Sequence, residues 1–164
     1  MSSQVLSEQV SESVLTAWAR LLRGHAASTR ELSAQLQSDH GLTINDYECL
    51  LHLSQAEHCS MRRIDLAEKL QLTPSGVTRL LDGLQEAGYV CKGSCESDAR
   101  VTYAVLTDAG REKLREASCS HLASVTTLFR ERYSEEELAT LAELLGRLPG
   151  AAATDGSECT AGHA

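Results

Sequence analysis

Hydroxyl groups and an arginine recur at helical spacing between residues 74 and 86. Ser75, Thr78, Arg79 and Asp82 follow one another at steps that place them on one face of a helix. Hydroxyl and guanidinium groups bond to base edges, and a guanidinium also pairs with phosphate. The chemistry indicated is therefore contact with a nucleic acid groove. The alternative is an ordinary polar helix surface.

The opposite face of the same segment would anchor the helix to a core. Its apolar stripe has the spacing i, i+3, i+4, i+7 and consists of Val77, Leu80, Leu81 and Leu84. Thr73 suits the N-cap, Pro74 suits the first helical position, and Gly88 follows the expected end. These signals predict a helix with one buried face and one polar face.

A shorter amphipathic helix and a hairpin flank this segment. The apolar side of the shorter helix is formed by Ile64, Leu66, Ala67 and Leu70. Gln71 and Leu72 leave only a short connection between the two helices. Tyr89 and Val90 begin a strand, and residues 91–100 form a polar turn. Residues 101–106, which are β-branched and aromatic in part, form the second strand of a hairpin. Residues 60–106 therefore predict a winged helix-turn-helix.

The distribution of charge supports a nucleic acid partner for this segment alone. The whole chain has a net charge of −8. Residues 61–115 hold nine basic and eight acidic side chains, whereas residues 1–60 hold three and seven, and residues 116–164 hold three and eight. Phosphate contacts are thus expected at one edge of the molecule only. The cations available there are Arg62, Arg63, Arg79, Lys92 and Arg100.

Helices are also predicted on both sides of residues 60–106. The first is marked by Val10, Val14, Trp18, Leu21, Leu22 and His25, and it runs towards Leu36. Thr43 and Asp46 favour a capping box for the second. A long helix opens at Thr107 and Asp108, and a capping box of Ser134 and Glu137 starts the last.

The fold class expected is mainly α with a small β-hairpin wing (α+β), a winged helix-turn-helix whose terminal helices form a dimerisation layer. We expect one domain over residues 5–148, with a DNA-binding lobe at 60–106 and dimerisation helices at 5–38 and 107–148. Residues 149–164 are expected to be a disordered tail. A two-fold axis would place two recognition helices in successive major grooves of an inverted repeat. The alternative is that these helices complete a monomeric core.

Composition and motifs exclude several classes of protein. No apolar run reaches the length of a membrane span, and residues 1–9 lack the regions of a signal peptide, so a cytoplasmic protein is expected. The chain contains no GxSxG, P-loop or HExxH motif, so we expect neither an enzyme nor a bound cofactor. The six cysteines are expected to be reduced thiols: Cys49, Cys59, Cys91, Cys95, Cys119 and Cys159.

The segment LAEKLQLTPSGVTRLLDGLQEAGYV, followed by Asp98-x-Arg100 and Leu106-Thr107-x-x-Gly110, resembles the MarR family of transcriptional regulators. The resemblance covers residues 10–148 and implies a homodimeric DNA-binding protein, more often a repressor than an activator. It implies that Thr73, Ser75, Thr78 and Arg79 contact the major groove and phosphates. It also implies that Arg100, oriented by Asp98, enters the minor groove. Arg62 and Lys92 are further candidate DNA contacts.

The resemblance also implies a small-molecule effector, such as an aromatic acid, in a crevice beside the DNA-binding lobe. Helix position suggests these lining residues: Trp18, Leu22, His25, Tyr47, Leu51 and Cys119. For each, a packing or solvent-facing role is the competing interpretation. The residues do not name the effector, the operator or the regulated genes.

Three other interpretations remain open at this point. Cys91 and Cys95 lie in the wing, where oxidation to a disulfide would displace Arg100. Cys49 and His52 stand at i, i+3 near His58 and Cys59, a spacing compatible with a metal, although we expect no metal site. Finally, a winged helix can dock onto a protein without touching DNA. The arginine on the outer helix face favours DNA.

Overall fold

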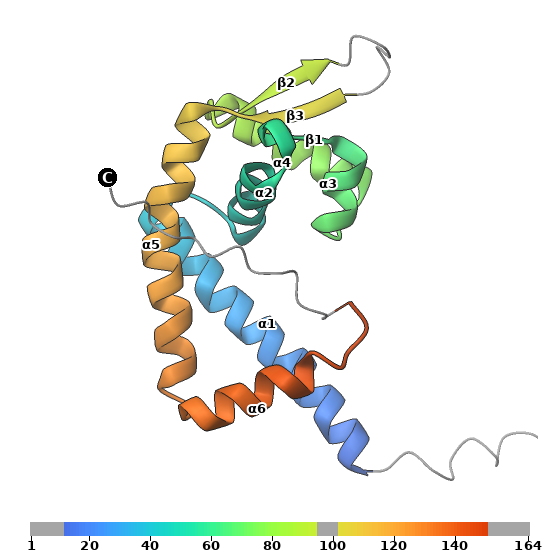
Figure 1. Ribbon diagram of the computed structural model, residues 1–164, viewed down its shortest axis with the longest axis vertical. Helices are drawn as coiled ribbons and strands as arrows, with labels where there is room; N and C mark the ends of the chain where they lie inside the picture. The colour runs from blue at the N-terminus through green and yellow to red at the C-terminus, as the bar shows by residue number, and fades with distance from the viewer. Residues whose placement is uncertain (1–11, 95–101, 151–164) are drawn as a thin grey trace, which may run out of the picture. The chain divides into compact units, whose positions relative to one another are not determined.

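The computed structural model describes residues 12–94 and 102–150 (Figure 1). The chain divides into two compact units, with a boundary between Ser124 and Val125 inside a continuous helix. Its order is α1 (Glu12–His40), α2 (Ile44–Gln55), a 3-10 turn (Glu57–Cys59), β1 (Ser60–Arg62), α3 (Arg63–Lys69), α4 (Pro74–Glu86), β2 (Val90–Ser94), β3 (Thr102–Leu106), α5 (Asp108–Arg130) and α6 (Glu135–Leu145). None of the helices in the described part of the chain is long and apolar enough to cross a membrane.

In the first unit, α1 ends and α2 begins at the residues that the sequence predicts. Gly41 adopts φ +68° after α1, a left-handed conformation that lacks a steric penalty only in glycine. The Thr43 hydroxyl accepts from the Asp46 backbone N–H at 3.2 Å, and the Asp46 carboxylate accepts from the Thr43 N–H at 2.8 Å. The predicted capping box of α2 is thereby confirmed.

The turn between α3 and α4 is short because the chain reverses through a left-handed residue. Gln71 has φ +52°, and the following Leu72 N–H donates to the Ala67 carbonyl at 3.0 Å. Thr73 then caps α4, accepting from the Gly76 backbone N–H at 3.1 Å. This confirms the predicted helix-turn-helix and its cap.

The sheet has three strands in the order β1-β3-β2, and both pairings are antiparallel. The sequence predicted only the hairpin of β2 and β3. In addition, β1 pairs with the far edge of β3, with Met61 opposite Ala104. The first hairpin strand begins at Val90 rather than at Tyr89, which packs half-buried against the core.

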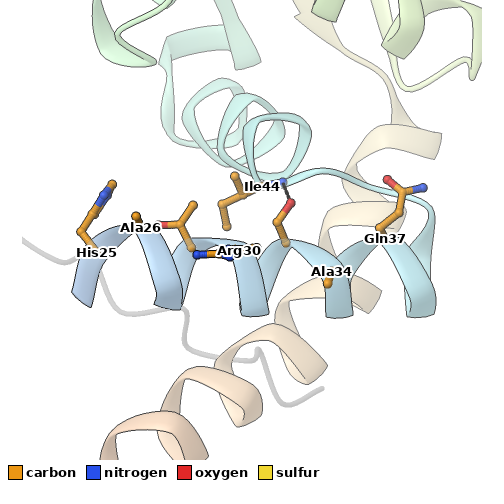
Figure 2. A pocket seen from close by; sticks show the side chains of 8 residues that line it. His25, Ala26, Arg30, Ala34, Gln37 and Ile44 are labelled. Atoms are coloured by element: carbon orange, nitrogen blue, oxygen red, sulfur yellow. Dashed lines mark hydrogen bonds between the residues drawn. The ribbon is translucent and has the colours of Figure 1, made fainter. Parts of the chain in front are cut away.

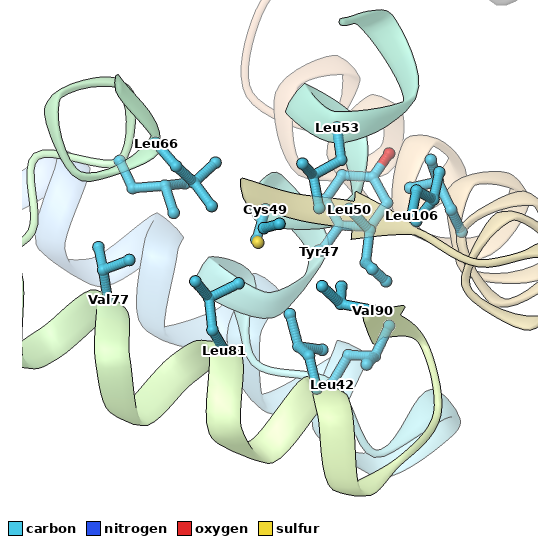
Figure 3. Close-up of a cluster of buried hydrophobic side chains, with 14 of the residues drawn as sticks. Leu42, Tyr47, Cys49, Leu50, Leu53, Leu66, Val77, Leu81, Val90 and Leu106 are labelled. Atoms are coloured by element: carbon cyan, nitrogen blue, oxygen red, sulfur yellow. The ribbon is translucent and has the colours of Figure 1, made fainter. Parts of the chain in front are cut away.

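The core of the first unit joins α2, α3, α4 and the sheet, with members from α1 and α5 as well (Figure 3). Leucine and valine dominate it, as the scarcity of aromatic residues requires. Its members include Leu36, Leu50, Leu53, Leu66, Val77, Leu81, Leu84, Val90, Leu106 and Leu114. One predicted member was wrong: Ile64, in the first turn of α3, is 65% exposed. The other three predicted members, Leu66, Ala67 and Leu70, are buried.

The second unit contains the last turns of α5 and all of α6. Ser134 and Glu137 form the predicted capping box, with the Ser134 N–H donating to the carboxylate at 2.8 Å. Arg130 pairs with Glu135 across the connecting turn at 3.0 Å, and the rings of Phe129 and Tyr133 lie 6.3 Å apart. These contacts hold the corner between the two helices.

Candidate nucleic-acid interface

The two faces of α4 separate as its sequence pattern predicts. Val77, Leu81 and Leu84 are at most 3% exposed, and Leu80 is half-buried. On the opposite side the exposed residues are Ser75, Thr78, Arg79 and Asp82. Because the buried stripe fixes the rotation of the helix about its axis, the outward side chains are held towards solvent as one surface. We call these four residues together with Thr73 the recognition face.

The hydroxyl groups of the recognition face are already bonded to one another and to the backbone. Thr73 and Ser75 lie 3.2 Å apart at their side-chain oxygens. The Thr78 hydroxyl donates to the Pro74 carbonyl at 2.9 Å. Arg79, in contrast, makes no ion pair with any residue that the structure describes. Its guanidinium is the one cationic group of this face.

The other candidate cations differ in whether their side chains already bond to other residues of the protein. Arg62 makes two 2.7 Å hydrogen bonds to the carboxylate of Asp65, which lower the pKa of Asp65. Arg63 reaches from α3 to the Thr78 hydroxyl at 2.7 Å. Lys92 is exposed on β2, opposite Ala104. An arginine that is paired with a carboxylate has less charge to offer a phosphate, so Arg62 is the weakest of these candidates.

The wing is described along its strands only. Gly93 lies so close to β3 that a Cβ there would come within 2.9 Å of the Val105 side chain. The predicted wing residues Asp98 and Arg100 lie outside the described residues, as does Cys95. Their proposed contacts with the minor groove remain predictions.

An open groove of about 640 Å³ follows one side of α1 (Figure 2). Its wall carries a guanidinium, an imidazole, hydroxyl groups and an amide among alanines, and it is closed on one side by the start of α2. The Ile44 backbone N–H donates to the Ser33 hydroxyl at 3.4 Å. The lining residues are His25, Ala26, Thr29, Arg30, Ser33, Ala34, Gln37 and Ile44.

Of the six residues predicted to line an effector pocket, this groove contains only His25. Trp18 and Leu22 are half or more exposed further along α1. Tyr47 is buried, and its hydroxyl lies 3.2 Å from that of Ser118. Leu51 packs half-buried against the core, and Cys119 is exposed on α5. The polar lining residues that the sequence analysis missed are Thr29, Arg30, Ser33 and Gln37.

Those missed residues have a signal in the sequence. These residues have the spacing i, i+3, i+4, i+7, i+11, as one face of a helix does: Ala26, Thr29, Arg30, Ser33 and Gln37. Small and polar side chains on such a face leave a hollow, whereas leucine side chains in the same positions would fill that space.

Comparison with known proteins identifies the lobe that carries this interface. The sequence profile of the MarR family matches residues 42–102, from the end of the α1–α2 turn into β3. A helix-turn-helix transcriptional repressor of Mycobacterium bovis is 35% identical over 97 residues, which cover 59% of this chain and 68% of the repressor.

Solved structures agree along most of the chain. AbsC, a MarR family transcriptional regulator from Streptomyces coelicolor, is 34% identical, with a TM-score of 0.74 over 85% of this chain and 93% of AbsC. The chain belongs to the MarR family. A second MarR regulator of that organism, Sco3205, was solved in complex with DNA; it is 26% identical, with a TM-score of 0.75 over 83% of this chain and 85% of its own.

Membership in the MarR family makes this chain a transcriptional regulator rather than an enzyme. It also confirms the mainly α winged helix fold that the sequence predicts. Within the family fold, the recognition face lies on the second helix of the helix-turn-helix, α4.

The cysteines of this MarR-family chain occupy different environments. Cys49 is fully buried, and burial, followed by the nearby charge of Asp46, raises the pKa of its thiol to about 12. The half-buried Cys59 accepts a hydrogen bond from Arg111 at 3.0 Å, and Cys91 and Cys119 are exposed. The described residues, 12–94 and 102–150, contain no cluster of three or more histidine, cysteine or acidic side chains that could hold a metal ion.

Proposed function

We propose that this MarR-family regulator is a repressor that binds an inverted-repeat operator in double-stranded DNA as a homodimer and is released by a small-molecule effector. The observation that carries the proposal is the recognition face of α4. It presents hydroxyl groups and an arginine that has no ion pair with any described residue, on a helix that its buried stripe holds in place. The DNA complex of Sco3205 and the repressor of M. bovis support the same role.

In this proposal the recognition face enters a major groove. Thr73, Ser75, Thr78 and Arg79 contact base edges and phosphates, and Arg62 adds a phosphate contact once it leaves Asp65. Lys92 and Arg100 extend the interface along the wing, with Asp98 orienting Arg100. An arginine suits the narrow minor groove, because that groove concentrates negative potential and a guanidinium is weakly hydrated.

Exposed apolar side chains support the homodimer. Val14, Leu15, Trp18 and Leu22 lie on α1 with half or more of their surface in solvent. In the second unit Leu144 is 50% and Leu148 41% exposed. Large apolar side chains gathered on a surface indicate an interface with a partner, and a symmetric partner supplies the second recognition helix of an inverted repeat.

The α1 groove supports the effector. Arg30 and His25 offer positive or hydrogen-bonding groups, and the alanines and Ile44 offer apolar walls (Figure 2). A small aromatic carboxylate satisfies both kinds of wall, with its ring against the apolar residues and its charge near the guanidinium. An effector lowers the affinity of the dimer for DNA if the effector favours a dimer geometry that separates the two recognition helices.

The proposal is tested by fluorescence anisotropy with DNA selected from a randomised library, at several salt concentrations. Arg79→Ala is expected to weaken binding about tenfold or more, because a specific arginine contact of this kind contributes about 1–3 kcal/mol. Arg115→Ala is the matched control, since it removes an exposed arginine of α5 that pairs with Glu112. The control should bind like the wild type.

A wild-type titration that stays flat at low salt would contradict DNA binding and favour a protein-docking role. In the same assay, millimolar benzoate is expected to weaken the wild-type complex. Arg30→Ala should abolish that response while leaving the affinity without benzoate unchanged. An equal response in both proteins would remove the α1 groove as the effector site.

A further inference from the structure

The two adjacent arginines at the start of α3 have different partners. Arg62, the residue before α3, is held by Asp65 in the first turn of that helix, through two hydrogen bonds of 2.7 Å. Arg63 is half-buried and crosses to α4, where its Nη2 donates to the Thr78 hydroxyl at 2.7 Å. Arg63 thus links the first helix of the helix-turn-helix to the recognition face.

The contacts of Thr78 fix which hydrogen-bonding role its hydroxyl has left. A threonine hydroxyl has one hydrogen to donate and two lone pairs to accept with. The hydrogen is used by the Pro74 carbonyl, which can only accept. One lone pair is used by Arg63, which can only donate. Towards solvent, Thr78 therefore presents one acceptor lone pair and its methyl group, and no donor.

An acceptor of this kind distinguishes between the edges of bases. In the major groove the hydrogen donors are the amino groups of adenine N6 and cytosine N4, whereas guanine and thymine present only acceptors there. Phosphate oxygens also only accept, so a Thr78 hydroxyl in this state has no bond to offer the DNA backbone. The guanidinium of Arg63, in contrast, retains further N–H groups beyond the one it gives to Thr78.

We propose that Arg63 is a positioning residue for base recognition: by donating to Thr78, it makes the Thr78 hydroxyl an acceptor that selects a base with an amino group, adenine or cytosine, at one position of each half-site. The inference rests on the proposed operator binding and adds to it a residue outside α4 and a chemical rule for one base position. Without Arg63, the Thr78 hydroxyl can turn and donate to a base acceptor or to phosphate. Discrimination at that position is then lost.

The test compares base preference rather than affinity alone. Sites are selected by the wild type from randomised DNA, and the contacted position is identified as the one whose preference disappears in Thr78→Val. Anisotropy is then measured on the preferred site and on a site with guanine or thymine at that position. The wild type should prefer the amino-bearing base about tenfold, the size of one good base contact. Arg63→Ala, Thr78→Val and the double variant should each show a ratio near one.

Two conservative variants serve as controls. Thr78→Ser keeps the hydroxyl and should retain the preference. Arg62→Ala removes the neighbouring arginine without touching Thr78, so any loss of affinity should be equal on both sites. Melting curves of each variant establish that it is folded, and Arg63→Met, which keeps the aliphatic stem but cannot donate to Thr78, provides the test if Arg63→Ala does not fold.

The outcomes separate this inference from the proposed function. It is overturned if Arg63→Ala keeps the tenfold ratio, if the effects of the two single variants multiply in the double variant, or if the wild type prefers guanine or thymine at the Thr78 position. In each of these cases the protein still binds an operator. If the wild type selects no DNA sequence at all, the proposed function fails and this inference fails with it.

Discussion

Cys49 lies fully buried on α2, whereas Cys91 and Cys119 are exposed. Burial and the charge of Asp46 raise the pKa of the Cys49 thiol to about 12, and the thiolate is the reactive form of a cysteine. Iodoacetamide at pH 8 is therefore expected to alkylate Cys91 and Cys119 in the folded protein and to leave Cys49 unmodified. Peptide mass spectrometry measures each site.

Unfolding in guanidinium provides the control, because Cys49 should then react at the rate of the other two. Labelling of Cys49 at that rate in the folded protein would contradict the burial. A protected Cys49 would also leave the exposed thiols as the available sites for any oxidative response.

Interactions between residues close in the chain could be predicted from the sequence, and those between distant residues could not. The caps by Thr43, Thr73 and Ser134 depend on the next three residues only, and all three are present. The bond from Arg63 to Thr78 spans 15 residues and depends on how α3 packs against α4. No spacing rule within one helix predicts such a contact.

At the scale of elements, the junction between β3 and α5 is closely packed around Gly110. The Thr107 hydroxyl accepts from the Gly110 N–H at 3.0 Å and donates to the Gly88 carbonyl at 2.7 Å. A Cβ on Gly110 would lie 2.1 Å from the Tyr89 carbonyl oxygen and 2.8 Å from Leu106. The start of α5 is thus held against the connection between α4 and β2 at a distance that only glycine allows.

Gly110→Ala is expected to lower the free energy of unfolding by about 1–3 kcal/mol or more, since the backbone at Tyr89 has to move. Gly24→Ala is the matched control, because a Cβ there meets nothing within 4 Å in the middle of α1. It should instead raise stability by about 0.5–1 kcal/mol through helix propensity. Urea denaturation followed by circular dichroism measures both, and equal stability of the two variants would contradict the close packing.

The element that the sequence did not predict is β1. Ser60, Met61 and Arg62 show no alternation long enough to indicate a strand. These residues form a strand because they pair with the edge of β3 that β2 leaves open, more than 40 residues later in the chain. The misplaced Ile64 follows from the same limit, since α3 has only seven residues, or about two turns, and so short an apolar pattern does not show which side the sheet and α2 cover. Longer patterns, in α4 and α5, predicted their elements correctly.

At the scale of the whole molecule, charge and apolar surface are segregated along the chain. The net charge of −8 repels the phosphates of DNA, whereas residues 61–115 hold nearly equal numbers of basic and acidic side chains. Affinity for DNA of arbitrary sequence is therefore expected to be low, because few cations displace counterions. Under the proposed function, specificity has to come from two copies of the recognition face bound at once, so dimerisation decides whether the protein binds its operator.

Trp18→Glu tests that dependence. Trp18 is 58% exposed in the single chain, so a charge there leaves the fold of the chain intact but is costly inside an apolar dimer interface. The variant is expected to sediment as a monomer at micromolar concentration, with an unchanged circular dichroism spectrum and operator affinity reduced at least a hundredfold. Thr16→Glu adds the same charge two residues away, on another side of α1, and should remain dimeric. A Trp18→Glu protein that stays dimeric, or a monomer that binds the operator as the wild type does, would show that the apolar face of α1 has another role.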